Sequence, residues 1–158
     1  MAYNDDLLEH ARFLAQLNPT APKQVDLRRS VSAAYYSLSH LLTTDAAQNW
    51  KNANQRYRFA RLFEHSQMRS CASRIVSRPL PSDPAQVSPA NDLVFVAKTF
   101  CKLQGERHTA DYDGTKVWTQ SEAADLIDIA EDAIAAWSRI RTRELAQDFL
   151  LDLLGSRQ

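Results

Sequence analysis

The stretch LRRSVSAAYYSLSHLL, residues 27–42, decides the fold that we expect for this chain. Its apolar residues recur every three or four positions, which places them on one face of a helix for about four turns. We therefore predict a helix that buries this face in the protein core. The predicted core face consists of Leu27, Val31, Ala34, Tyr35, Leu38, Leu41 and Leu42.

The opposite side of the same stretch is not an ordinary solvated surface. Arg29, Tyr36 and His40 are spaced seven and four residues apart, so they line up along one stripe of the helix. Small residues, among them Ser32 and Ala33, lie between these large side chains. A helix with both a core face and a second, selective face is expected to contact the protein core on one side and another helix or a ligand on the other. Arg29, Tyr36 and His40 are accordingly candidate ligand-binding residues.

Composition favours an ordinary globular protein. The 158 residues are 44% hydrophobic and 24% charged, with a formal net charge of zero, so no overall charge points to nucleic acid or membranes. The first ten residues carry acids where a signal peptide would carry bases, and no apolar run approaches the length of a membrane span. We expect one domain over residues 1–158, located in the cytoplasm without a membrane partner.

Glycine and proline are confined to a few positions, and the segments between them show helical spacing without strand alternation. The segment at 53–76 changes its apolar side midway, which indicates either a kink near 64–67 or two helices. Ser88 and Pro89 resemble a helix start, and Gly105 resembles the C-terminal cap of the same helix. We predict an all-α, up-and-down antiparallel bundle of about five helices. The expected helices cover residues 4–17, 22–49, 53–76, 89–104 and 119–154, the last with a break near 141.

The cysteine and histidine content points away from metal chemistry. Cys71 and Cys101 both lie beside apolar helical residues, so we interpret them as reduced thiols in the core, although a disulfide is an alternative. Two cysteines and four scattered histidines lack the spacing of zinc ligands. We expect no metal and no cofactor.

The second informative stretch is ERHTADYDG, residues 106–114, which we expect to connect two helices. On a structural interpretation, Asp113 makes a turn, Asp111 pairs with Arg107, and Tyr112 plugs the end of the bundle. On a functional interpretation, Arg107 and His108 contact a phosphate, and Asp111 orients one of them. These four residues, Arg107, His108, Asp111 and Tyr112, are further candidates for ligand binding.

Together the two stretches resemble HEPN-domain proteins. RRSVSAAYYSLSHLL is similar to the second helix of that family, and RHTADYD is similar to an R-x-x-A-D-Y string that ends its penultimate helix. The resemblance covers residues 5–140, with 141–155 as a helical extension. It implies a bundle that dimerises side to side. Many family members are metal-independent ribonucleases, often toxins or antiviral effectors, and others bind nucleotides or partner proteins.

The resemblance also defines what a catalytic site would need. Ribonuclease members carry an R-x4–6-H motif, often with a polar residue after the arginine, and His108 follows Arg107 here. The second histidine would fall at positions 112–114, where this chain has Tyr, Asp and Gly. We therefore expect a dimeric, non-catalytic module that binds nucleotide, RNA or a partner protein, in a toxin–antitoxin or defence setting. The alternative is a ribonuclease with a degenerate site built from Arg107, His108 and His40.

Charge is distributed unevenly along the chain. Residues 51–78 contain seven bases and one acid, whereas residues 119–154 contain eight acids and three bases. The basic segment, with Tyr57 and Phe59 interleaved, is compatible with contact to an RNA backbone. Pairing between the basic and the acidic helices is an equally direct explanation.

Overall fold

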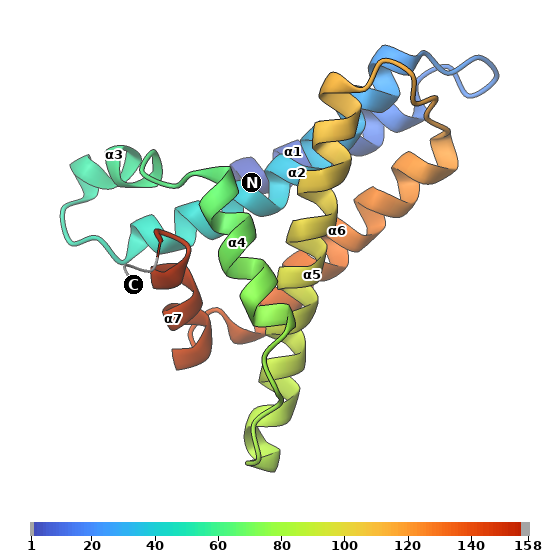
Figure 1. Ribbon diagram of the computed structural model, residues 1–158. Helices are drawn as coiled ribbons and strands as arrows, with labels where there is room; N and C mark the ends of the chain where they lie inside the picture. The colour runs from blue at the N-terminus through green and yellow to red at the C-terminus, as the bar shows by residue number, and fades with distance from the viewer. Residues whose placement is uncertain (1, 156–158) are drawn as a thin grey trace.

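The computed structural model describes residues 2–155. Within that range it contains seven α-helices, one short 3-10 helix and no strand (Figure 1). The all-α prediction is confirmed, but the helices outnumber the expected five. No helix among the described residues is long and apolar enough to cross a membrane. The elements are α1 (Tyr3–Gln16), α2 (Gln24–Gln48), η1 (Ala53–Gln55), α3 (Arg56–Ala60), α4 (His65–Val76), α5 (Pro84–Tyr112), α6 (Gln120–Ile140) and α7 (Glu144–Asp152).

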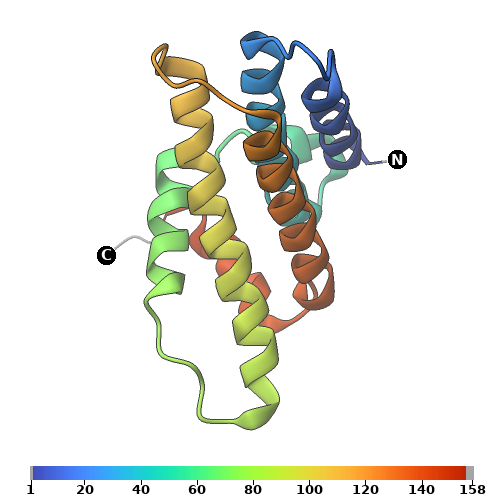
Figure 2. The same ribbon diagram turned by 90° about the vertical axis from the view of Figure 1, so that its right-hand side faces the viewer.

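Helix α2 is the central element, and the predicted core face is confirmed. Every residue of that face is buried, with Leu27, Tyr35 and Leu38 fully inaccessible to solvent. The helix contacts α1, α5 and α6, of which α5 and α6 run side by side in opposite directions (Figure 2). Helix α1 covers one flank of α2, where the Ser30 hydroxyl donates a hydrogen bond to the Ala11 carbonyl oxygen at 2.9 Å, and Tyr3 of α1 reaches His40 on the opposite stripe. Small residues on this side therefore allow α1 to approach closely.

The ambiguous segment at 53–76 forms two separate helices. Helix α3 ends at Ala60 and α4 begins at His65, with turn residues between them. The change of apolar side in the sequence marks this break, because each helix packs in a different direction. Figure 1 shows α3 set apart from the bundle, whereas α4 lies alongside α5. Within α4, the buried residues are Met68, Cys71, Ala72 and Ile75.

The predicted boundaries of the fourth helix are wrong at both ends. Helix α5 starts at Pro84, one turn and a half before Pro89, because Asp83 caps it by accepting a hydrogen bond from the Ala85 N–H at 3.0 Å. It also continues through Gly105 to Tyr112. The stretch 106–114 is therefore mostly helical rather than a connecting loop. This extension presents Arg107 and Asp111 on the same helical face, one turn apart.

An arginine from α2 stabilises the extended end of α5. The Arg28 guanidinium donates hydrogen bonds to the carbonyl oxygens of Ala110 and Asp113, both at 2.8 Å, and of Lys116 at 2.6 Å. These bonds satisfy carbonyls that the helix end and its following turn leave unpaired. They offset the cost of about 1 kcal/mol that a glycine imposes inside a helix.

The predicted capping box and the predicted break in the last helix are both confirmed. The Thr119 hydroxyl accepts a hydrogen bond from the Glu122 N–H at 3.1 Å, and α6 ends at Ile140. Asp45 of α2 then ties this region to the core. It accepts a hydrogen bond from the Trp137 indole N–H at 2.7 Å and pairs with Arg141 just after α6.

Both cysteines are free thiols, as predicted. Cys71 is buried in the core, and burial raises the pKa of its thiol to about 11. Cys101 is partly exposed and packs beside Ser73.

Replacing Leu38 with alanine tests the assignment of the core face. Leu38 is fully buried, so we expect Leu38→Ala to lower the free energy of unfolding by about 2–5 kcal/mol through lost burial and the cavity left behind. Denaturant unfolding followed by circular dichroism measures the change. Leu151→Ala, at a site 67% exposed, is the matched control and should change stability by less than about 0.5 kcal/mol. Equal effects of the two variants would contradict the assignment.

Candidate functional site

Two adjacent tyrosines on α2, Tyr35 and Tyr36, pack against residues of α4 and α5. Tyr35 is fully buried, and its ring lies 5.6 Å from that of Phe100 in α5. Its hydroxyl forms a hydrogen bond with Nδ1 of His65, the first residue of α4. Tyr36 is partly buried, and its ring is 6.0 Å from that of His65. The pair thus joins α2, α4 and α5 at one point.

Arg107 of α5 lies against both tyrosines. Its guanidinium carbon is 5.2 Å from the centre of the Tyr35 ring and 5.7 Å from that of Tyr36, within the range of cation–π attraction. One Nη atom donates a hydrogen bond to the Tyr36 hydroxyl at 3.2 Å and lies 3.5 Å from an Asp111 carboxylate oxygen. Only 15% of the Arg107 side chain is exposed. The guanidinium is therefore held in place on several sides.

Asp111 is itself fixed by α2. The Ser32 hydroxyl donates a hydrogen bond to the other Asp111 carboxylate oxygen at 2.6 Å. Ser32, Asp111, Arg107 and Tyr36 thus form a continuous polar chain between α2 and α5. Arg107 Nε is buried and has no hydrogen-bond partner in this arrangement. Not all of the hydrogen-bonding capacity of Arg107 is used by the protein.

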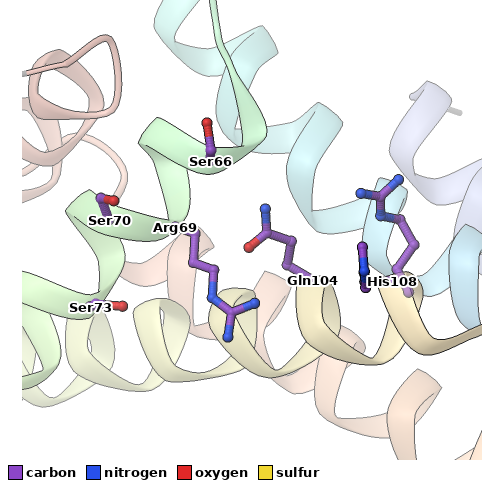
Figure 3. A pocket seen from close by; sticks show the side chains of 7 residues that line it. Ser66, Arg69, Ser70, Ser73, Gln104 and His108 are labelled. Carbon is purple, nitrogen blue, oxygen red and sulfur yellow. The ribbon is translucent and has the colours of Figure 1, made fainter. Parts of the chain in front are cut away.

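Arg107 also borders a cleft of about 450 Å³ between α4 and α5. Figure 3 shows Gln104 reaching from α5 toward α4, between Arg69 and His108. The Gln104 amide N–H donates a hydrogen bond to the His65 carbonyl oxygen at 2.8 Å, while its Oε1 is buried without a partner. The other residues lining the cleft are Ser66, Ser70 and Ser73, which follow one face of α4.

The Arg69 side chain packs over Gly105 of α5. A Cβ atom at position 105 would be 3.7 Å from one Nη atom of Arg69 and 3.9 Å from the other, which are ordinary van der Waals distances. Gly105, which resembled a helix cap in the sequence, lies inside α5 at the position where the Arg69 side chain of α4 packs against that helix. The cleft consequently has two arginines on its border, one from each helix.

The remaining predicted site residues lie around this junction rather than in it. The His40 ring is 5.0 Å from Tyr3 and 6.1 Å from Tyr36, so it packs among aromatic rings. His108 is exposed and lines the α4–α5 cleft, with its ring 4.9 Å from that of the exposed Tyr112. Arg29 is exposed and borders a second cleft of about 750 Å³ that Tyr36, Asp111 and Tyr112 also line.

The sequence analysis missed His65, Arg69 and Gln104. His65, for which the sequence showed no partner, is bonded to Tyr35 across 30 positions of the chain. Arg69 was counted only as part of the basic segment, and Gln104 as the end of a helix. The serines at 66, 70 and 73 share a helical face with Arg69, and this spacing is the one signal that pointed to the cleft.

Burial controls protonation at the junction. Burial raises the pKa of Tyr35 to about 12, so the phenol stays protonated at neutral pH in its hydrogen bond with His65. Burial also lowers the pKa of His65, and the positive charge of Arg107 lowers it further. Burial likewise lowers the pKa of His40. Both imidazoles are therefore favoured in the neutral form in the folded protein.

The basic and acidic segments pair with each other only in part. Arg78 lies 3.7 Å from Asp152 of α7. The acids of α6 reach elsewhere, since Asp128 is 3.0 Å from Arg12 of α1 and Glu131 contacts the same arginine. Within residues 2–155, no group of three His, Cys, Asp or Glu side chains is arranged to hold a metal. The groups that the site brings together are arginine, tyrosine, serine, amide and imidazole side chains and the Asp111 carboxylate.

A scan against protein-family models and searches of curated proteins and of solved structures return no match to this chain. Its function is consequently argued from the geometry of the site and from the resemblance of the two motifs.

The lowered pKa of His65 predicts an acid-sensitive junction. Between that lowered pKa and the ordinary value of 6.5, the unfolded chain binds more protons than the folded protein. The free energy of unfolding should therefore fall as the pH drops below about 6.5. Thermal unfolding between pH 8 and pH 5 measures this, and His65→Gln should flatten the decline. His10→Gln, at an exposed position, is the control and should leave the slope unchanged.

Proposed function

We propose that this chain is a HEPN-like, dimeric and non-catalytic module that binds a phosphate group of a nucleotide or RNA in the cleft between α4 and α5. The observation that carries the proposal is the position of Arg107, mostly buried yet bordering the cleft, with its hydrogen bonds to Tyr36 and Asp111 both made by the same Nη atom. The resemblance to HEPN domains supplies the dimer and the toxin–antitoxin or defence setting.

The chemistry of the cleft supports a phosphate ligand. Arg69 and Arg107 provide positive charge and planar sets of donors, which suit phosphate oxygens. Ser66, Ser70 and Ser73 add hydroxyl donors along α4. Rigid support of Arg107 by two aromatic rings and Asp111 reduces the entropy that the side chain would lose on binding.

The Gln104 amide supports a ligand that carries more than phosphate. Its buried Oε1 accepts no hydrogen bond from the protein, and an unpaired buried acceptor costs about 1–3 kcal/mol. A hydroxyl or amino group of a ligand would satisfy it. Every ribonucleotide carries ribose hydroxyls, and adenine, guanine and cytosine also carry an amino group, whereas inorganic phosphate carries neither a ribose nor a base.

Two features support binding without catalysis. The second histidine of the R-x4–6-H motif is absent from positions 112–114. His65, the histidine whose ring packs beside the tyrosine pair, has its Nδ1 occupied by the Tyr35 hydroxyl. In the tautomer whose Nδ1 accepts the hydrogen bond from the phenol, the imidazole carries its own proton on Nε2 and has no free nitrogen to act as a general base.

A degenerate ribonuclease is the second candidate, and His65 is the observation that favours it. Its lowered pKa keeps the imidazole neutral, which a general base requires. Its ring packs against the two tyrosines that Arg107 also contacts. His108, also on the cleft border, would then act as the acid. Cleavage would have to proceed without metal.

The proposal predicts that Arg107→Ala weakens nucleotide binding at least about tenfold, because hydrogen bonds to charged groups contribute about 1.5–3 kcal/mol each. Titration calorimetry with AMP, a short oligouridylate and inorganic phosphate measures the affinity and separates nucleotide from bare phosphate. Arg143→Ala, at an exposed arginine far along the chain, is the matched control. Incubating the protein with mixed RNA in the presence of EDTA tests cleavage in the same samples.

Each contrary outcome has a distinct meaning. Unchanged binding in Arg107→Ala would contradict a ligand role. Thermal unfolding of Arg107→Ala, Asp111→Ala and the double variant would then separate the structural alternative. A strongly non-additive loss of stability assigns Arg107 to clamping Asp111 alone. RNA cleavage that persists with EDTA and disappears in His65→Gln would replace the binding module by the ribonuclease.

A further inference from the structure

A stacked pair of aromatic rings stands on the surface where α2 ends and α3 begins. The rings of Trp50 and Phe59 are 5.2 Å apart and inclined by only 29°. Trp50 is 45% exposed although its position is fixed, because its indole N–H donates a hydrogen bond to the Gln55 side-chain oxygen at 3.0 Å. Its carbonyl oxygen accepts a hydrogen bond from Arg56 at 3.0 Å. The stack is thus held in place before any partner arrives.

Hollows lie on both sides of this stack. One, of about 350 Å³, is bordered by Arg58 and Leu62. The other, of about 490 Å³, is formed with Leu151 and Leu154 at the C-terminal end of the described chain. Figure 1 shows α3 and α7 on the same side of the molecule, next to the end of α2. The two hollows share Trp50 and Phe59, so they form one groove with an aromatic ridge.

Several large apolar side chains in the groove are exposed to solvent. Leu62 is 63% exposed and Leu151 is 67% exposed. Scattered exposed apolar residues are normal, but a clustered patch around fixed hollows is typical of an interaction surface. None of these residues belongs to the arginine cleft between α4 and α5.

The α3 side of the groove is basic, whereas α7 on the other side carries Glu144, Asp148 and Asp152. Residues 50–62 contain Lys51, Arg56, Arg58 and Arg61 and no acid, and Arg58 lines one of the hollows. Among the residues that the structure describes, none of these four side chains forms an ion pair. Their charge is therefore available to a partner, and a partner with acidic residues would match it.

We propose that this groove, the Trp50–Phe59 groove, binds an amphipathic helix of a partner protein whose polar face is acidic. Apolar side chains spaced at i, i+3 or i+4, and i+7 would enter the hollows on either side of the aromatic ridge. Acidic residues beside them would face Arg58 and Arg61. A second copy of this chain is the alternative occupant, and the oligomeric state tests it.

The test uses three synthetic helical peptides that share one length. The first carries a leucine stripe and glutamates, the second the same stripe with lysines, and the third the glutamates with serines replacing the leucines. We expect saturable binding of the first peptide alone, measured by anisotropy of an attached dye and by a change in Trp50 fluorescence. Leu151→Glu and Arg58→Glu should each weaken it at least about tenfold, since each places a charge against the wrong group. Leu80→Glu, at an exposed leucine outside the groove, is the control.

Thermal unfolding of each variant shows whether it is folded, which the exposure of Leu151 and Arg58 leads us to expect. Equal binding of the acidic and the basic peptide would overturn the proposal, as would binding unaffected by both groove variants. Sedimentation that shows a dimer lost in Leu151→Glu would assign the groove to a second copy instead. Displacement of the acidic peptide by oligouridylate, with loss of RNA binding in Arg58→Glu, would assign it to nucleic acid.

Discussion

The hydrogen bond between the buried Tyr35 hydroxyl and His65 organises this protein, because a buried hydroxyl without a partner is destabilising. The hydroxyl bonds to His65, which fixes the start of α4 against the middle of α2. The next residue, Tyr36, points to a different side and bonds to Arg107 of α5. Two consecutive positions on one helix thereby set the places of two other helices. The core face of α2 supplies the driving force, and the tyrosine pair supplies the alignment.

The same alignment creates the candidate site. Once α4 and α5 are placed, Arg69 and Arg107 border one cleft, with the Gln104 amide between the helices. Asp111 holds Arg107 through a carboxylate that Ser32 of α2 positions in turn. The functional groups are thus fixed by contacts that also stabilise the fold. The Trp50–Phe59 groove lies at the other end of α2 and depends on different residues, so a nucleotide and a protein partner would not compete for space.

The predictability of each feature follows from how local its cause is. The core face of α2 and the Thr119 capping box were predicted correctly because periodicity and caps lie within a few residues. The start of α5 was misplaced because Asp83–Pro84 and Ser88–Pro89 carry similar start signals, and only the structure selects the first. The end was misplaced because Gly105 looked like a cap, while the bonds from Arg28 that extend the helix come from 82 or more positions away. His65 and Gln104 were missed for the same reason, since their partners are distant in sequence. The pairing of Arg107 with Asp111 could be anticipated from their closeness in sequence, although the stretch was expected to be a loop and is helical.

The central claim is that Arg107 is held by the tyrosine pair with donor capacity left for a ligand, and nuclear magnetic resonance of arginine side chains tests it most directly. The Nε–H group of Arg107 is buried and unpartnered in the free protein, so its signal should be resolved from those of exposed arginines such as Arg58 and should persist at neutral pH. Adding AMP should shift it, and Tyr36→Phe should weaken its dispersion. A signal that coincides with the exposed arginines and does not respond to AMP would contradict the account.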